Sequence, residues 1–234
     1  MNSAYPSKNQ PSSGYLVETE HTKLLLDCGS GVMMTLAESI DLDTLDHIFI
    51  SHDHPDHIAD LGVMQHRRLV QRMMKPELSP LHIYSTFTSK EKKDYYSLFH
   101  SELHSIHETR TIGDLEVTFE KTIHPVECHA IKIEVNGKKL VYTADTAFSE
   151  TVLHFSADAD LLITESSLYP KMDGSKPGHM NIEEAVNFGL QSRARKVVLS
   201  HLPVYGPLEK MQAVIDATGE THIQLAEPNM TIEL

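Results

Sequence analysis

The stretch ISHDHPDHIADLG, residues 50–62, places three histidines and two aspartates within six positions, directly after an apolar run. Four of them, His52, His54, Asp56 and His57, follow the spacing H-x-H-x-D-H. Several imidazoles with a carboxylate suit zinc, and after it manganese or iron, and ligands close in sequence cost little entropy to assemble. The pattern predicts metal ligands. The alternative is a polar loop in which Asp56 caps a helix.

Three further candidate ligands follow predicted strands elsewhere in the chain. His124 comes after LEVTFEKTI, Asp145 after LVYTA and His201 after KVVLS, just as HIFIS precedes His52. Polar groups at strand ends can converge on one edge of a layered fold. Two metal ions need more ligands than the opening motif offers, and these residues supply them if Asp145 bridges both ions. The sequence therefore contains the candidate metal ligands that a two-metal hydrolase needs.

Length and patterning favour one domain spanning residues 1–234, with 40% hydrophobic and 23% charged residues. Strand and helix patterns are mixed, and Asn136-Gly137 between strands at 131–135 and 139–142 is a strong hairpin signal. We expect an α+β fold of two mixed sheets with outer helices. The patterns predict helices at 58–74, 182–192 and 208–218, and two strands after the last helix.

Charge and cysteine content limit the partners and the compartment. The net charge of -13 gives no basic footprint for a nucleic acid. No apolar stretch reaches the roughly 18 to 20 residues that span a bilayer, and the first 16 residues lack the features of a secretory signal. Cys28 and Cys128 are too few for a disulfide framework, so we expect buried thiols. These features predict a cytoplasmic protein with no membrane partner.

Five motifs in order resemble the metallo-beta-lactamase superfamily over almost the full length. They are DCGSG at 27–31, SHDHPDH at 51–57, TIH at 122–124, TADT at 143–146 and LSH at 199–201. The resemblance implies a four-layer αβ/βα sandwich with the site at one edge of two sheets. It also implies two metal ions: one held by His52, His54 and His124, a second by Asp56, His57 and His201, with Asp145 bridging and Asp27 supporting the ligand loops.

A closer resemblance is to the tRNase Z-like phosphodiesterase branch. The resemblance rests on four segments: SGYL at 13–16, the TADT turn at 143–146, TES at 164–166, which contains Glu165, and GHMNIEEA at 178–185, which contains His179. It implies that His179 is the general acid, that Glu165 orients it, and that Asp56 orients the attacking hydroxide. Only 20 residues separate His124 from Asp145, too few for the arm with which tRNA-processing members bind tRNA.

The expected function is therefore a dinuclear-metal phosphodiesterase that attacks small phosphodiesters with a metal-bridging hydroxide, with zinc as the first candidate metal and manganese or iron as others. The alternatives are a lactonase or thioesterase of the same fold, a tRNA 3'-end endoribonuclease lacking the arm, and a non-catalytic metal-binding scaffold. Monomer and homodimer both stay open. Ordinary packed or surface roles are expected for the other histidines: His21, His47, His66, His82, His100, His104, His107, His129, His154 and His222.

Overall fold

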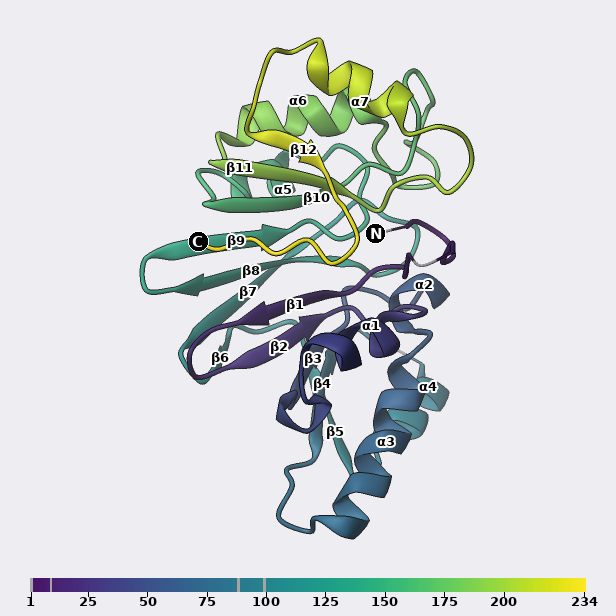
Figure 1. The fold of residues 1–234 in the computed structure, drawn as a ribbon, viewed down its shortest axis with the longest axis vertical. Coiled ribbons are helices and arrows are strands. Elements are labelled where there is room, and N and C mark those ends of the chain that lie inside the picture. Colours follow the sequence, from purple (N-terminus) through teal and green to yellow (C-terminus); the bar gives the residue numbers. More distant parts are fainter. Residues whose placement is uncertain (1, 9, 88, 99) are drawn as a thin grey trace. The chain divides into compact units, whose positions relative to one another are not determined.

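The computed structural model describes residues 2–8, 10–87, 89–98 and 100–234. The chain divides into two compact units, one of Tyr5–Glu108 and one of residues 2–4 with Thr109–Leu234. Each unit has its own sheet (Figure 1): a five-stranded sheet in the order β1-β2-β3-β4-β5, and a seven-stranded sheet in the order β12-β11-β10-β9-β8-β7-β6. That the units act as one domain stays a prediction. In the described part of the chain, no helix is long and apolar enough to cross a membrane.

The first unit is built on short, mostly parallel strands. Its elements are β1 Tyr15–Glu18, β2 Lys23–Leu26, α1 Val32–Ser39, a 3-10 turn Leu42–Thr44, β3 His47–Phe49, α2 Pro55–Ile58, α3 Leu61–Met74, β4 Leu81–Ser85, α4 Lys90–Tyr96 and β5 Ser101–Ser105. Strands β1 and β2 are antiparallel, and β2 to β5 are parallel. The run Leu24, Leu25 and Leu26 is fully buried, as expected for a strand covered on both faces.

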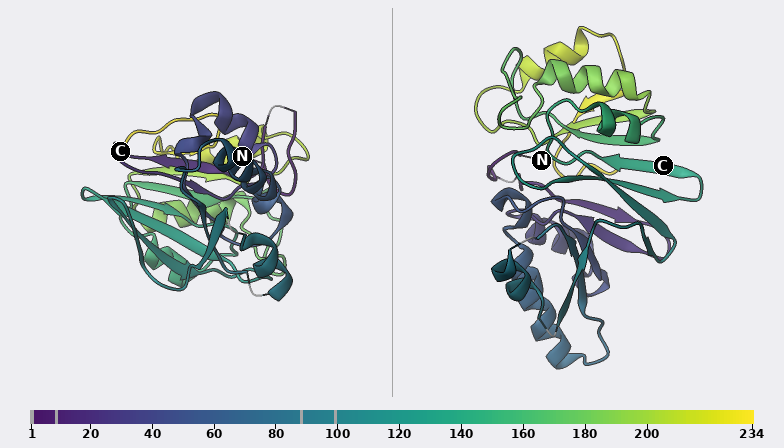
Figure 2. Two further views of the ribbon diagram at one scale, coloured as in Figure 1. Left: turned by 90° about the horizontal axis from the view of Figure 1, so that it is seen from below. Right: turned by 180° about the vertical axis from the view of Figure 1, so that it is seen from behind.

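Helix α3 is fastened to this unit by two buried polar side chains. The Arg68 guanidinium donates to the carbonyls of Leu45 and Ser79. The Gln65 amide donates to the Tyr96 carbonyl, which holds α3 beside α4 (Figures 1 and 2). Buried donors that lack acceptors cost about 1–3 kcal/mol each. These contacts therefore specify where α3 packs, in addition to its apolar face.

The second unit contains β6 Arg110–Ile112, β7 Leu115–Lys121, β8 His129–Val135, β9 Lys138–Tyr142, α5 Glu150–Phe155, β10 Leu161–Glu165, α6 Ile182–Ser192, β11 Lys196–Ser200, α7 Glu209–Asp216 and β12 Ile223–Leu225. Strands β6 to β9 form an antiparallel meander, and β9 to β12 are parallel. Strands β7, β9 and β11 therefore run in the same direction. Their carboxyl ends lie at the same edge of the sheet, where three predicted ligands follow them.

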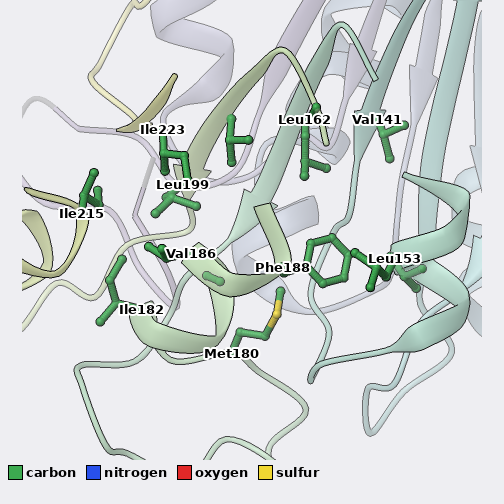
Figure 3. Close-up of a cluster of buried hydrophobic side chains, with 14 of the residues drawn as sticks. Val141, Leu153, Leu162, Met180, Ile182, Val186, Phe188, Leu199, Ile215 and Ile223 are labelled. Carbon is green, nitrogen blue, oxygen red and sulfur yellow. The ribbon is translucent and has the colours of Figure 1, made fainter. Parts of the chain in front are cut away.

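The core of this unit lies between α6 and the parallel strands (Figure 3). Ile182, Val186 and Phe188 meet strand residues such as Leu162 and Leu199, all of them buried. Apolar residues spaced three and four apart give α6 the buried face that a surface helix needs. Each fully buried side chain of this size contributes about 1.5–3 kcal/mol. The core thus fixes the edge from which the candidate site projects.

Local signals in the sequence were accurate where turn chemistry is strict. Asn136 and Gly137 both have positive φ, 51° and 75°, as a type I′ hairpin requires, and Asn181 with Glu184 forms the expected capping box of α6. The helix expected over 58–74 is α3, which ends at Met74 as predicted but begins at Leu61, because the separate helix α2 ends at Ile58. One strand follows α7 instead of two. Strands β5 and β6 were missed because SELHS and RTI show no apolar alternation.

Candidate metal centre

The H-x-H-x-D-H motif spans a strand-to-helix connection in the first unit. Strand β3 ends at Phe49, and α2 begins at Pro55, whose fixed φ suits the first helical position. His52 and His57 are buried, and Asp56 is nearly so. The N-cap of α2 is His54, with no side-chain capping bond. The capping role considered for Asp56 is therefore wrong, and the metal-ligand interpretation of the motif stays a prediction.

Asp27 orients two of the motif's imidazoles. Its Oδ2 lies 2.7 Å from His57 Nδ1 and accepts from Ser51 Oγ at 2.8 Å, while Oδ1 accepts from Ser51 N at 2.7 Å. Because the Ser51 hydroxyl proton goes to Asp27, its oxygen accepts from His52 Nδ1 at 3.0 Å. Both histidines therefore carry the proton on Nδ1 and direct the lone pair of Nε2 outward, the form that binds a metal.

The DCGSG loop packs directly against α2. The Cys28 amide donates to the His57 carbonyl at 2.8 Å. A Cβ on Gly29 would lie 1.9 Å from the Asp56 carbonyl oxygen, so only glycine fits. Burial raises the pKa of the Cys28 thiol well above its ordinary value, and the charges of Asp60 and Asp27 add to this. Cys28 is therefore a neutral packing residue, and the loop serves to hold α2 in place.

Spacing within the motif fits a bound ion. His52 Nε2 lies 3.1 Å from His54 Nδ1, and His57 Nε2 lies 3.6 Å from Asp56 Oδ2. Two ligand atoms at about 2.0–2.1 Å from one tetrahedral zinc are about 3.4 Å apart. Both pairs match this separation within a few tenths of an ångström. The donor set and its spacing thus suit a divalent metal.

In the second unit, three predicted ligands follow β7, β9 and β11. Asp145 and His201 are buried, and His201 Nε2 lies 3.6 Å from Asp145 Oδ1, again a coordination-like separation. Candidate ligand atoms of His124 and Asp145 lie within 4.8 Å of each other. Ala144 and His201 have positive φ, 52° and 54°, which costs a non-glycine residue of order 1 kcal/mol or more. The fold thus accepts local strain to place these side chains.

Glu165, at the end of β10, is a buried acceptor with donors on both oxygens. Oε1 accepts from Thr146 N at 3.3 Å and Met180 N at 2.9 Å, and lies 3.1 Å from His179 Nδ1. Oε2 accepts from Ser167 N at 2.9 Å and from Ser167 Oγ at 2.6 Å. These contacts hold the side chain of Glu165 in one orientation. Glu165 thus contacts His179 at Nδ1, and the orienting role expected for it stays a prediction.

Ser167 links Glu165 to the predicted ligand His201. Its hydroxyl gives its proton to Glu165, so its oxygen accepts from His201 Nδ1 at 2.7 Å. The Nε2 atom of His201 is thereby the metal-binding nitrogen. Ligand atoms of Asp145, His179 and His201 all lie within 4.8 Å of one another. The predicted acid and two predicted ligands are therefore neighbours.

Gly178 positions the remaining ligand of this unit. Its carbonyl lies 3.0 Å from His124 Nδ1, which leaves Nε2 for a metal. Gly178 has φ +74°, and a Cβ there would lie 2.8 Å from His124 Cα. Both facts require glycine at this position. Sequence reasoning did not identify Gly178, Ser51 or Ser167, because a serine or a glycine near a histidine is too common a pattern to carry a signal.

The predicted site residues thus form two sets, each assembled within its own unit. His52, His54, Asp56 and His57, supported by Asp27, belong to the first; His124, Asp145, Glu165, His179 and His201 belong to the second. All of these residues lie within a region of the chain that matches the model of a known protein family. The model described as "Beta-lactamase superfamily domain" matches residues 22–202.

The chain belongs to the beta-lactamase superfamily. Its curated relatives include "Probable metallo-hydrolase YhfI" of Bacillus subtilis (strain 168), 33% identical over 98% of this chain and 95% of YhfI. The crystal structure of YhfI from Bacillus subtilis matches with a TM-score of 0.92 at 31% identity, covering 98% of this chain and 94% of YhfI.

Two more distant structures share the fold. The short form of human tRNase Z matches with a TM-score of 0.70 at 20% identity, over 99% of this chain and 96% of that chain. A diphosphatase of the PhnP family matches with a TM-score of 0.73 at 17% identity, over 94% of this chain and 83% of that chain. At these identities the likeness concerns the fold alone.

This member of the superfamily therefore has the metallo-beta-lactamase fold, and the predicted α+β class with two mixed sheets and helices is confirmed. It is a metal-dependent hydrolase. The histidine and aspartate sets described above fit the divalent metal that such an enzyme requires.

Proposed function

We propose that the protein is a dinuclear-metal phosphodiesterase acting on small phosphodiesters. Seven residues would hold the two ions: His52, His54 and His124 the first, Asp56, His57 and His201 the second, and Asp145 both. Support comes from the protonation pattern within each unit. Asp27, Ser51, Ser167 and Gly178 fix the Nδ1 proton of four of these histidines, leaving Nε2 as the ligand atom.

Zinc is the metal we propose, with manganese and iron as alternatives, because imidazoles dominate the donor set. Bound there, the two ions would lower the pKa of a water to supply a nucleophile and would neutralise charge that develops on the phosphoryl oxygens. Asp56 would orient that nucleophile. Among the buried groups of α2, only its carboxylate and the His57 imidazole offer ligand atoms of this kind.

The observation that carries the proposal is the Glu165–His179 pair beside Asp145 and His201. Glu165 is buried, whereas 19% of the His179 side chain is exposed. The carboxylate of Glu165 holds Nδ1 of His179, which leaves Nε2 as the atom that would donate a proton. Departure of an alkoxide from phosphorus requires such a proton. His179 is therefore proposed as the general acid and Glu165 as the residue that positions it.

Hydrolysis at a carbonyl carbon is the alternative reaction. A lactone also releases an alkoxide and would use the same acid, whereas a thioester releases a thiolate, which leaves without one. The acid therefore favours oxygen leaving groups. A tRNA substrate is disfavoured by the net charge of -13 and by the short connection between His124 and Asp145.

The proposal extends to organisation and location. We propose that both units work as one hydrolase domain over residues 1–234. The matched family region, residues 22–202, runs through both units and includes all seven proposed ligands. We also propose a cytoplasmic location, which suits the buried thiols of Cys28 and Cys128.

A panel assay tests the reaction class. Zinc- and manganese-loaded protein is assayed on aryl phosphodiesters, cyclic nucleotides, lactones and thioesters, and the phosphodiesters should give the highest kcat/KM. His179→Asn should lower kcat on cyclic nucleotides, whose leaving group is an alkoxide, by about 10²–10⁴-fold. His154→Asn is the matched control, because His154 bonds only the Glu150 carbonyl of its own helix at 2.7 Å. Full turnover after chelation, or a preference for lactones, would overturn the proposal.

A further inference from the structure

Two histidines and a glutamate meet on neighbouring strands of the first unit, apart from the H-x-H-x-D-H motif. His82 lies on β4, and Glu102 and His104 lie on β5. Each offers one ligand atom, and these atoms lie within 4.8 Å of one another. Sequence reasoning assigned both histidines ordinary roles, because β5 was not predicted and the pairing of β4 with β5 is not visible from spacing.

The strand register explains how the three side chains come together. In the parallel pair β4–β5, His82 is opposite Glu102 and Tyr84 is opposite His104. Residues two apart on a strand point to the same face, so Glu102 and His104 share a face, as do His82 and Tyr84. His82 is therefore next to Glu102 and diagonal to His104, a distance that long and aromatic side chains bridge.

The separations in this cluster match those of the motif. His82 Nδ1 lies 3.1 Å from His104 Nε2, the same separation as between His52 Nε2 and His54 Nδ1. Glu102 Oε2 lies 3.5 Å from His82 Nδ1 and 3.9 Å from His104 Nε2. Ligands of one tetrahedral zinc lie about 3.4 Å apart. If the Glu102 carboxylate moved closer to the two imidazoles by a few tenths of an ångström, the three side chains would supply three of the four ligands of a tetrahedral ion.

Aromatic neighbours already hold both imidazoles. The His47 ring stacks on His82 at 5.1 Å between centroids, and the Tyr84 ring stacks on His104 at 4.8 Å. Ordered rings lose less entropy on binding. The side chains of His82, Glu102 and His104 are 25%, 56% and 30% exposed, so an ion can enter and water can fill the fourth position.

We propose that His82, Glu102 and His104 form an additional binding site for a divalent transition-metal ion of the zinc class. His82 is level with His47, the first residue of β3, whereas His52 comes after the end of that strand. Among the described residues, the group of His82, Glu102 and His104 shares no member with the groups that contain the residues of the motif, so this would be a separate ion. The bound ion would tie the edge strand β5 to β4.

Metal stoichiometry tests this site without reference to catalysis. Full-length protein is stripped with chelator, equilibrated with zinc at a buffered free concentration, and analysed for bound metal. His82→Gln/His104→Gln should bind one equivalent fewer than wild type. Glu102→Gln should bind the ion at this site at least tenfold more weakly. The control is His222→Gln, because His222 pairs with Glu220 at 3.1 Å but belongs to no ligand cluster among the described residues.

Equal stoichiometry in wild type and the double variant would overturn the proposal. The same follows if His222→Gln also loses an equivalent, because zinc would then be binding to single surface histidines. Phosphodiester turnover is measured on the same samples, and the double variant should retain it. The proposed dinuclear site is judged by the wild-type total, and the additional site only by the difference of one equivalent. Failure of either is therefore distinguishable from failure of the other.

Discussion

Glu165→Gln preserves the size of a buried side chain but turns one acceptor oxygen into a donor. Thr146, His179 and Met180 present their N–H groups to Oε1, and Ser167 presents both N–H and O–H to Oε2. Either orientation of the glutamine amide therefore sets its NH₂ group against at least one buried backbone N–H. One unsatisfied buried donor costs about 1–3 kcal/mol, and loss of the charged acceptor weakens the other bonds by about 1 kcal/mol. We expect the free energy of unfolding to fall by about 2–4 kcal/mol.

Urea denaturation of the metal-free protein measures this loss. The matched control is Glu184→Gln, the same chemical change at a residue that accepts one bond, from Asn181 N at 3.0 Å. Glutamine also serves in a capping box, so the control should lose less than about 0.5 kcal/mol. If Glu165→Gln is no less stable than Glu184→Gln, the assignment of Glu165 as a multiply bonded carboxylate is wrong.

The same variant tests the proposed role of His179. Without the carboxylate at 3.1 Å, the imidazole loses the contact that orients it. We expect kcat on a cyclic nucleotide, whose leaving group is an alkoxide, to fall by about 10²–10⁴-fold with a smaller change in KM. A folded Glu165→Gln enzyme with the wild-type kcat would refute the positioning role.

Two further predictions concern a glycine and a surface ion pair. Gly178→Ala should weaken zinc binding at least tenfold in a competition assay, because its Cβ would displace His124; Gly137→Ala has the same positive φ with nothing within 4 Å and should leave zinc affinity unchanged. The hydrogen bond from Lys75 lowers the pKa of Asp43, so the ion pair stabilises the fold above the unfolded pKa of about 3.9 and is lost as pH falls below it. Asp43→Asn should therefore cost about 0.5–1 kcal/mol at pH 7, and this difference should vanish by about pH 2 in denaturant titrations.

The fold was predictable from sequence wherever a motif or a turn has strict chemical requirements. The H-x-H-x-D-H spacing located the connection between β3 and α2, and Asn136-Gly137 located the hairpin between β8 and β9. Strand β5 escaped because its sequence, SELHS, has polar residues at four of its five positions. Its place in the sheet is decided by its pairing with β4, and such non-local pairing leaves no periodic signal in either strand.

The histidines and acids proposed for the site could be selected from the sequence, but the groups that orient them could not. Both units use the same arrangement. In one, the Ser51 hydroxyl donates to Asp27 and accepts from His52. In the other, the Ser167 hydroxyl donates to Glu165 and accepts from His201. In both cases the carboxylate takes the hydroxyl proton, which leaves the oxygen lone pairs of the serine for the imidazole N–H. Each carboxylate also holds a second histidine, His57 or His179. One buried charge thus sets the tautomer of two imidazoles, and losing it would disturb both.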